Sequence, residues 1–223
     1  MPEFPNHNPV SIRRLILVPG LITLGITLLR LAGELQNWSP RFFSRSPGGG
    51  GSLVGISWLV PLFGIYFAVK LVKEGERPQS TMKAILFTVL GIILFFAFAA
   101  TAVALKLAFV WIIVLSATGS IAAIVVCWRG WPLLSETLFK YGLFARIPVL
   151  IVMFFAIRGN WGTHYDSPSP QVPAMGVWAE FFWTGVIPQL TFWLAYTVLV
   201  GALFGAVAGA LAARRSKLAA AAA

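Results

Sequence analysis

Long apolar runs alternate with short polar segments along this chain of 223 residues. A helix of about 20 apolar residues crosses the roughly 30 Å hydrocarbon core of a bilayer. The run AILFTVLGIILFFAFAATAVAL at 84–105 lacks the polar residue at every second position that a transmembrane β-strand would show. The pattern predicts an all-α, polytopic transmembrane helix bundle with about six membrane-spanning helices. The expected spans are residues 15–36, 53–72, 84–105, 107–127, 138–157 and 182–212.

The composition agrees with this fold class and limits the partners. Hydrophobic residues make up 58% of the chain and charged residues 11%, whereas about a quarter of residues are charged in soluble domains. In a soluble protein a net charge of +10 would suggest nucleic acid as a partner. Here Lys and Arg cluster at the ends of the apolar runs, so we expect the lipid bilayer as partner and no nucleic acid. The single cysteine, Cys127, excludes an intrachain disulfide and a cysteine-based zinc site.

The distribution of basic residues predicts the orientation. Cytoplasmic loops of membrane proteins carry an excess of Lys and Arg. In an N-in/C-in arrangement, twelve of the 17 basic residues lie on the inner side, and the reverse arrangement inverts that ratio. We therefore expect a multi-pass protein of the cell inner (plasma) membrane. The five basic residues left on the outer side are Arg30, Arg41, Arg45, Lys106 and Arg158.

The chain is expected to form one domain with short tails. Residues 1–12 are polar and rich in proline, which predicts a disordered cytoplasmic N-terminus. No small-residue cleavage site follows the first apolar run, so we expect it to remain as the first helix. Residues 13–213 form a single six-helix transmembrane domain with outer loops near 37–52 and 158–181. Residues 214–223 form a cytoplasmic tail, whose alanine-rich end is also typical of a cloning remnant.

The six segments differ in character. The third and fourth form a hairpin around Lys106, without proline and almost without polar side chains, which is typical of a lipid-facing scaffold. Each of the other four contains a proline, and each proline frees a backbone carbonyl that a neighbouring group must satisfy. These four segments flank the two outer loops, so we expect them to form the functional half. Their prolines are Pro19, Pro61, Pro148 and Pro188.

The first outer loop begins as a helical extension of the first span. Arg30 and Glu34 are four residues apart, so they share a helix face and are expected to pair. Trp38 suits the aromatic belt at the membrane interface. The four glycines of 48–51 predict a flexible link. A solvated connector explains this loop equally simply, and that interpretation is preferred.

Arg146 lies about a turn and a half inside the cytoplasmic end of the fifth span. An arginine within the membrane is costly and marks a functional candidate. The alternative is that its long side chain reaches the inner headgroups, and its closeness to that surface favours this alternative.

The last apolar run is longer than one membrane crossing. Trp178 and the aromatic residues after it are expected to form an interfacial piece before Pro188. Gly201, Gly205 and Gly209 follow at intervals of four, a spacing that allows close helix packing. The partner of this glycine face is either another helix of the chain or a second copy, which would make the protein a homo-oligomer.

The densest group of polar side chains is RGNWGTHYDSPSP at 158–170. His164 and Asp166 could act as an acid–base pair, and the planar fork of Arg158 suits a phosphate or carboxylate. Glu34 and Glu180 are the other acidic candidates on the outer side. The simpler alternative is a membrane boundary made of turn-forming and interfacial residues. We expect an ordered outer cap in which Arg158 pairs with one of these anions, and only a boundary if Arg158 is unpaired.

Familiar catalytic and cofactor motifs are absent from the sequence. No His-x₃-His or Cys-x₂-Cys spacing predicts a metal site, and the glycine run at 48–51 lacks the Lys and Ser/Thr of a phosphate loop. No G-x-S-x-G occurs, and none of the apolar runs contains a histidine to act with a serine. We expect no metal and no cofactor, and the sequence leaves open whether the protein is an enzyme.

Three functions remain. The preferred one is a transporter or channel subunit for a small solute or anion, lined by the first, second, fifth and sixth spans, with Arg146, Arg158 and Glu34 contacting the solute. The four prolines and the charge within the membrane favour it. The second is a membrane-embedded enzyme acting on a lipid or lipid-linked substrate at the outer surface through His164, Asp166 and Arg158. The third is a non-catalytic membrane assembly partner.

The predicted orientation can be tested by labelling. Cysteines introduced at Ser44 and Ser167 should react with a membrane-impermeant reagent added outside, whereas a cysteine at Gln79 should not. The reason is that the charge bias places the first two in outer loops and the third in an inner loop. Labelling at position 79 alone would contradict the N-in arrangement.

Overall fold

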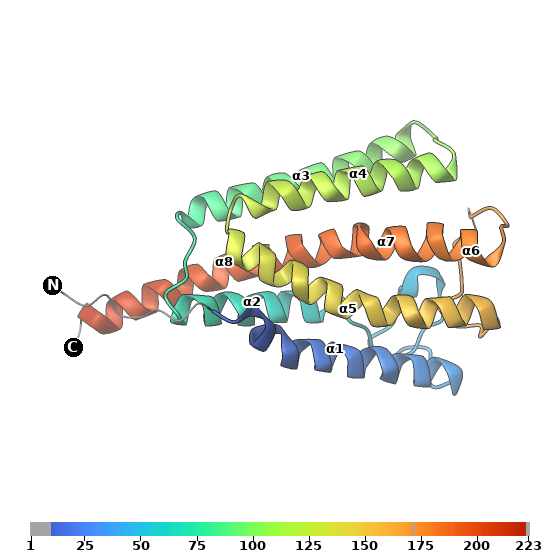
Figure 1. Cartoon of the computed structure of the whole chain (residues 1–223), viewed down its shortest axis with the longest axis horizontal. Coiled ribbons are helices and arrows are strands. Elements are labelled where there is room, and N and C mark those ends of the chain that lie inside the picture. Colours follow the sequence, from blue (N-terminus) through green and yellow to red (C-terminus); the bar gives the residue numbers. More distant parts are fainter. Residues whose placement is uncertain (1–9, 171, 222–223) are drawn as a thin grey trace.

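A computed structural model describes residues 10–170 and 172–221 of the chain. Within these residues the fold is helical and contains no strand, so the predicted all-α class is confirmed. The helices run along one axis, and the chain enters α1 and leaves α8 at the same end of the bundle (Figure 1). The elements are α1 (Ile12–Leu35), η1 (Pro47–Gly49), α2 (Leu59–Lys73), α3 (Thr81–Ala104), α4 (Phe109–Trp128), α5 (Pro132–Gly159), α6 (Val177–Glu180), η2 (Phe181–Val186), α7 (Ile187–Leu190) and α8 (Phe192–Ala221).

Five helices are long and apolar enough to cross a membrane, which confirms a multi-pass helical membrane bundle. They are α1, α3, α4, α5 and one continuous rod, Val177–Arg215, that contains α6, η2, α7 and most of α8. The second predicted span, 53–72, forms only the 15-residue helix α2. At 1.5 Å per residue this is about 22 Å, less than the hydrocarbon core.

The second span therefore begins later than predicted, at Leu59 instead of residue 53. Residues 53–58 form turns, and Gly55 is buried where a side chain would meet the guanidinium of Arg30 at 3.1 Å. The chain thus passes close to Arg30 before α2 begins. Pro61 lies in the first turn of α2, where a missing N–H costs no helical hydrogen bond, so it does not free a helical carbonyl as expected.

The inner and outer ends of the bundle follow from the connections. The outer end, in the predicted orientation, holds the segments 36–58, 105–108 and 160–176. The part of the chain that the structure describes begins and ends at the inner end (Figure 1). Residues 1–9 of the expected N-terminal tail lie outside the described residues, and the expected C-terminal tail is a continuation of α8 as far as Ala221.

The last rod contains a widened turn ahead of its proline. Residues Phe181–Val186 form a π-helix, and Pro188 follows at the start of α7. Pro188 cannot donate an N–H, and a π-turn absorbs such an irregularity within a helix. Thr191 then leaves helical geometry, with φ −120° and ψ −73°. The expected interfacial piece before Pro188 is thus part of one continuous but irregular helix.

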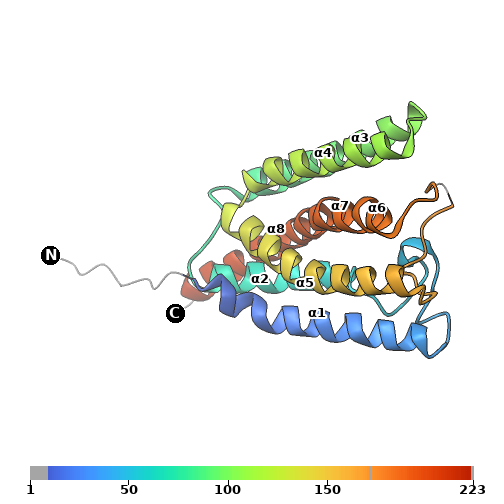
Figure 2. The same ribbon diagram turned by 45° about the vertical axis from the view of Figure 1, so that its right-hand side comes forward.

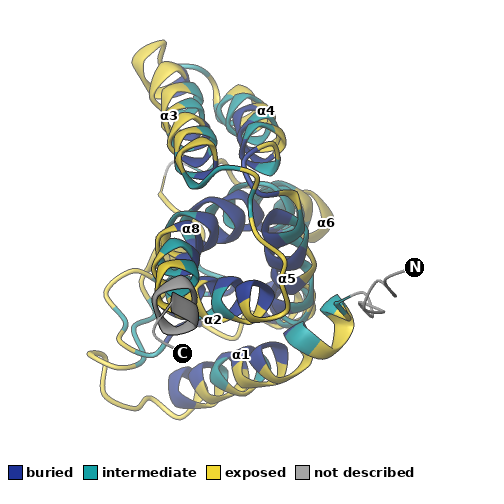
Figure 3. Cartoon of the chain, turned by 90° about the vertical axis from the view of Figure 1, so that its left-hand side faces the viewer, coloured by how far each residue is buried: buried dark blue, intermediate teal, exposed yellow. Residues whose placement is uncertain are grey.

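The core lies between α2, α5 and α8, whose buried faces point towards one another in the view along the bundle (Figure 3). A side chain at Gly205 would lie 2.8 Å from the carbonyl oxygen of Gly64 in α2 and 2.9 Å from Leu134 in α5. Gly201 and Gly209 lie against the same two elements. Of the two partners that the glycine spacing allowed, these residues contact helices of the same chain.

Gly205→Leu should destabilise the protein because the new side chain meets backbone on one side and Leu134 on the other. We expect a loss of about 3 kcal/mol, at the upper end of overpacking effects. The matched control is Gly25→Leu, because Gly25 lies on the exposed side of α1 with no atom within 4 Å of an added Cβ. Thermal unfolding in detergent measures both, and equal midpoints would contradict the packing role.

Candidate functional site

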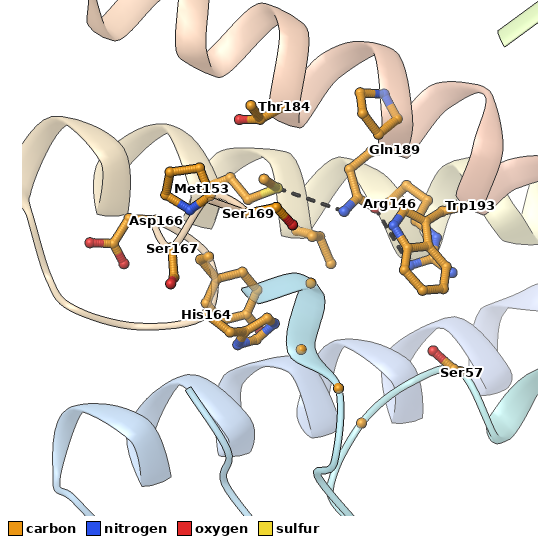
Figure 4. A pocket seen from close by; sticks show the side chains of 18 of the residues that line it. Ser57, Arg146, Met153, His164, Asp166, Ser167, Ser169, Thr184, Gln189 and Trp193 are labelled. Atoms are coloured by element: carbon orange, nitrogen blue, oxygen red, sulfur yellow. Dashed lines mark hydrogen bonds between the residues drawn. The ribbon is translucent and has the colours of Figure 1, made fainter. Parts of the chain in front are cut away.

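A cavity of about 850 Å³ lies in the outer half of the bundle (Figure 4). Its walls come from α1, the segment 48–58, α5, residues 164–169 with Val172, and the last rod. Parts of the four proline-containing segments thus lie at the cavity. The second of them contributes the chain before α2, and α2 itself does not line the cavity. The outer end of α4 adds Phe109, Ile112 and Ile113, so the hairpin predicted as a lipid-facing scaffold also forms part of the wall.

The non-helical segment 53–58 lies within the bundle because α2 begins well short of the outer ends of α1 and α5 (Figure 1). Irregular backbone at membrane depth is tolerated only where protein buries it or where it lines a hydrated cavity. Gly55, Ile56 and Ser57 line the cavity. The short second helix is therefore part of the construction of the cavity.

The outer wall is fixed by the carboxylate of Glu34, whose side chain is 0% exposed. It accepts a hydrogen bond from Nε of Arg30 at 2.8 Å, which confirms the predicted pair. It also accepts one from the backbone N–H of His164 at 2.8 Å and lies 2.5 Å from Nδ1 of the His164 ring. Sequence reasoning missed this contact, because the two residues are 130 positions apart.

Arg30 continues the network into the first outer loop. Its Nη2 donates to the carbonyl oxygens of Ser44 at 3.1 Å and Gly49 at 3.0 Å. Gly49 has φ +73°, and a side chain there would lie 2.9 Å from the His164 ring. The glycine run thus allows a close approach to this network at Gly49, while most residues of 36–51 are exposed, as in the expected solvated connector.

Asp166 organises its own turn. Its carboxylate accepts from the backbone N–H groups of Gly162 at 2.8 Å and Thr163 at 2.7 Å, and from the Thr163 hydroxyl at 2.6 Å. His164, by contrast, contacts Glu34. The two members of the expected acid–base pair therefore have different partners, and Asp166 has a structural role in shaping the loop.

His164 and Tyr165 are held against α1. The Tyr165 hydroxyl donates to the carbonyl oxygen of Thr27 at 3.4 Å, and the two rings lie 3.9 Å apart between centroids. Burial lowers the pKa of His164, although the hydrogen bond to Glu34 opposes this shift. Burial raises the pKa of Tyr165. A neutral imidazole that donates from Nδ1 to Glu34 keeps Nε2 as an acceptor.

Arg158 does not act as the predicted anchor. It lies in the last turn of α5, is exposed, and forms no ion pair with any residue in the described ranges. The expected pairing of Arg158 with Glu34, Asp166 or Glu180 is therefore wrong. The cap is therefore not anchored as predicted, although Thr163 and Tyr165 of the same segment are buried.

Arg146 lies at the deep end of the cavity and is 3% exposed (Figure 4). Its side chain points into the bundle, so the favoured expectation that it reaches the inner headgroups is wrong. Nη1 lies 3.5 Å from Oε1 of Gln189, and Nη2 lies 3.5 Å from the hydroxyl of Thr197. The guanidinium carbon lies 5.2 Å from the ring centre of Trp193.

The charge of Arg146 has no counterion. Among residues 10–170 and 172–221 no carboxylate forms an ion pair with it, and its Nε has no hydrogen-bond partner. Its two hydrogen bonds are at the long limit for such contacts. The guanidinium is thus the least satisfied polar group of the site.

Acidic groups lie at the opposite end of the cavity. Asp166 lies far from Arg146 in the close-up view (Figure 4). Glu180, in α6 at the outer start of the last rod, also lines the wall. Glu180 forms no ion pair in the part of the chain that the structure describes. No group of three His, Cys, Asp or Glu side chains among the described residues could hold a metal ion.

No family model matches the chain, and no curated protein and no solved structure shows a significant similarity to it. The geometry of the site therefore carries the functional argument alone.

Glu34→Gln should loosen the outer wall because the neutral amide leaves the buried Arg30 without its carboxylate. Breaking a buried ion pair costs about 3 kcal/mol or more, which corresponds to roughly 6–12 °C in the unfolding midpoint of a chain of this size. The control is Glu136→Gln, which breaks the exposed pair with Lys140 and should change stability by less than about 1 kcal/mol. Similar shifts in both variants would contradict the role of Glu34.

Proposed function

We propose that the protein is a membrane transport protein that binds the anionic group of a solute at Arg146. The observation that carries the proposal is a buried guanidinium, 3% exposed, that faces a cavity of about 850 Å³ without a counterion. An ionised side chain within a membrane protein is costly unless it is paired. A phosphate or carboxylate in the cavity would supply the missing charge and the missing acceptor for Nε.

The irregular helices around the cavity support transport over simple binding. Transporters place their sites where membrane helices are broken, because such breaks expose backbone groups and allow movement. Pro148 lies two residues beyond Arg146 in α5, and the π-turn, Pro188 and Thr191 interrupt the last rod on the opposite side. Gln189, which contacts Arg146, lies between two of these interruptions.

The inner side of the bundle is closed below Arg146. Tyr141 lies one and a half turns further in on α5, and its hydroxyl is 2.8 Å from that of Thr23 in α1. The rings of Phe63 and Phe67 pack against it at 5.5 and 5.4 Å between centroids. A cavity that reaches the outer loops above a closed inner half corresponds to an outward-facing state. The inner membrane as location and the N-in orientation remain predictions.

A membrane-embedded enzyme is the second candidate, and one observation favours it. The buried carboxylate of Glu34 orients the ring of His164 on the cavity wall, an arrangement that acid–base catalysts use. The lipid or lipid-linked substrate would then react next to His164 at the outer end of the cavity. Transport is preferred because the unpaired charge lies at the deep end, away from this histidine.

Replacing Arg146 by Gln and by Lys separates a solute contact from a structural role. Wild-type proteoliposomes should take up labelled butyl phosphate at millimolar concentration in a saturable manner. Arg146→Gln should reduce this uptake at least tenfold, and Lys should restore little of it because it lacks the bidentate fork. The thermal stability of Arg146→Gln should be unchanged or higher, since the substitution removes a buried unpaired charge.

The control for this experiment is Arg158→Gln, which removes an exposed cation of the same type and should leave uptake unchanged. Two results would contradict the proposal. One is loss of folded protein in Arg146→Gln with rescue by Lys, which indicates a structural cation. The other is uptake that persists in Arg146→Gln, or that wild-type protein does not support.

A further inference from the structure

We infer that the solute is an anionic amphiphile, with one phosphate or carboxylate group bound at Arg146 and an apolar body in the rest of the cavity. This inference deepens the proposed function and rests on it. Three features of the cavity carry it: its size, the chemistry of its walls, and the position of its charges.

The cavity is much larger than a simple inorganic anion. Its volume is about 850 Å³, whereas one water molecule occupies about 30 Å³ in the liquid, and an inorganic phosphate is only a few times larger. Cavities of roughly 300–1,000 Å³ hold organic ligands of several hundred daltons. A small inorganic anion at Arg146 would leave most of the volume unfilled.

The walls between the deep end and the outer mouth are mainly apolar. Val149 and Met153 extend outwards from Arg146 along α5. Ile112 and Ile113 of α4 also line the cavity. An uncharged polar solute would lose its hydrogen bonds with water along these surfaces without replacing them, whereas an alkyl or aryl group gains free energy by burial.

The charges that line the cavity favour a ligand with a single anionic group, bound at the deep end. Arg30, the other buried cation of the wall, is already paired with Glu34. The outer end carries Asp166 and Glu180, whose negative charge disfavours a second anionic group there. The ligand that fits is therefore singly headed, with its charge at Arg146.

The outer end of α4 indicates where the apolar body extends. Phe95 of α3 packs on Phe192 at 4.8 Å between centroids, and this contact holds the α3–α4 hairpin to the start of α8. Further out, the hairpin diverges from the last rod in both side views (Figures 1 and 2). Ile112 and Ile113 line the cavity on this side. An apolar body can thus lie against Ile112 and Ile113, away from the acidic mouth.

A series of alkyl phosphates tests this inference. Binding of inorganic, butyl, octyl and dodecyl phosphate is measured by calorimetry to the protein in phosphatidylcholine nanodiscs, with binding to empty discs subtracted. Affinity for the free aqueous ligand should rise with chain length by up to about fourfold per methylene until the cavity is full. Arg146→Gln should weaken every phosphate at least tenfold. Dodecyltrimethylammonium, which has the opposite charge, should bind at least tenfold more weakly than dodecyl phosphate.

Two variants of α4 locate the apolar body. Ile113→Trp fills the wall of the cavity and should weaken dodecyl phosphate at least tenfold while leaving butyl phosphate within about twofold. Ile121→Trp is the control, because Ile121 is exposed on the same helix and does not line the cavity. If Ile113→Trp still binds butyl phosphate, the variant is folded. The chain-length series on wild-type protein tests the inference independently of any variant.

The outcomes separate the inference from the function on which it rests. Binding of butyl phosphate through Arg146 with no gain from octyl or dodecyl chains overturns the amphiphile and leaves anion transport intact. Binding that is independent of Arg146, or equal for the ammonium compound, overturns both. Phosphatidylglycerol added to the nanodiscs distinguishes two sources of the ligand. If it competes with dodecyl phosphate, the ligand is a membrane lipid; if it does not compete, the ligand is a free amphiphile. Both have the chemistry inferred here.

Discussion

The buried carboxylate of Glu34 holds together the outer half of the molecule. Through Arg30 it fixes the carbonyl oxygens of Ser44 and Gly49, and through His164 it fixes the segment that follows α5. Two long outer segments, far apart in sequence, are thereby attached to the end of one helix. One carboxylate thus satisfies several donors at once, in a region where unsatisfied polar groups are expensive.

The two buried arginines illustrate opposite solutions to the same physical problem. Arg30 has a carboxylate at 2.8 Å and two backbone carbonyls, so its charge and its donors are used within the chain. Arg146 has only an amide and a hydroxyl, both at 3.5 Å, and the ring of Trp193. A fold that needs a buried cation only for stability would satisfy it as it satisfies Arg30. The difference therefore points to a partner from outside the chain.

Local patterns allowed much of the fold to be predicted, and the site only in part. The long spans were predicted from the apolar runs, because a membrane-spanning helix must match the thickness of the bilayer. The Arg30–Glu34 pair was predicted from its four-residue spacing. The late start of α2 was missed, as was the close approach of Gly55 to Arg30, because local pattern does not show contacts between two segments. The direction of Arg146 was missed for a similar reason: its partners lie 43 and 51 residues later in the chain. Neither partner belongs to a recognisable motif.

The position of Gln189 connects binding to movement. Its side-chain oxygen accepts from Arg146, and its nitrogen lies 3.7 Å from the sulfur of Met153, so this residue joins the last rod to α5. It is also bracketed by Pro188 and the non-helical Thr191, where the rod is already irregular and bends at small cost. In the proposed transport function, an anion at Arg146 would compete with this neutral acceptor for the guanidinium and so weaken the contact between Arg146 and the rod. A ligand shifts a conformational equilibrium only through such a difference in contacts between two states.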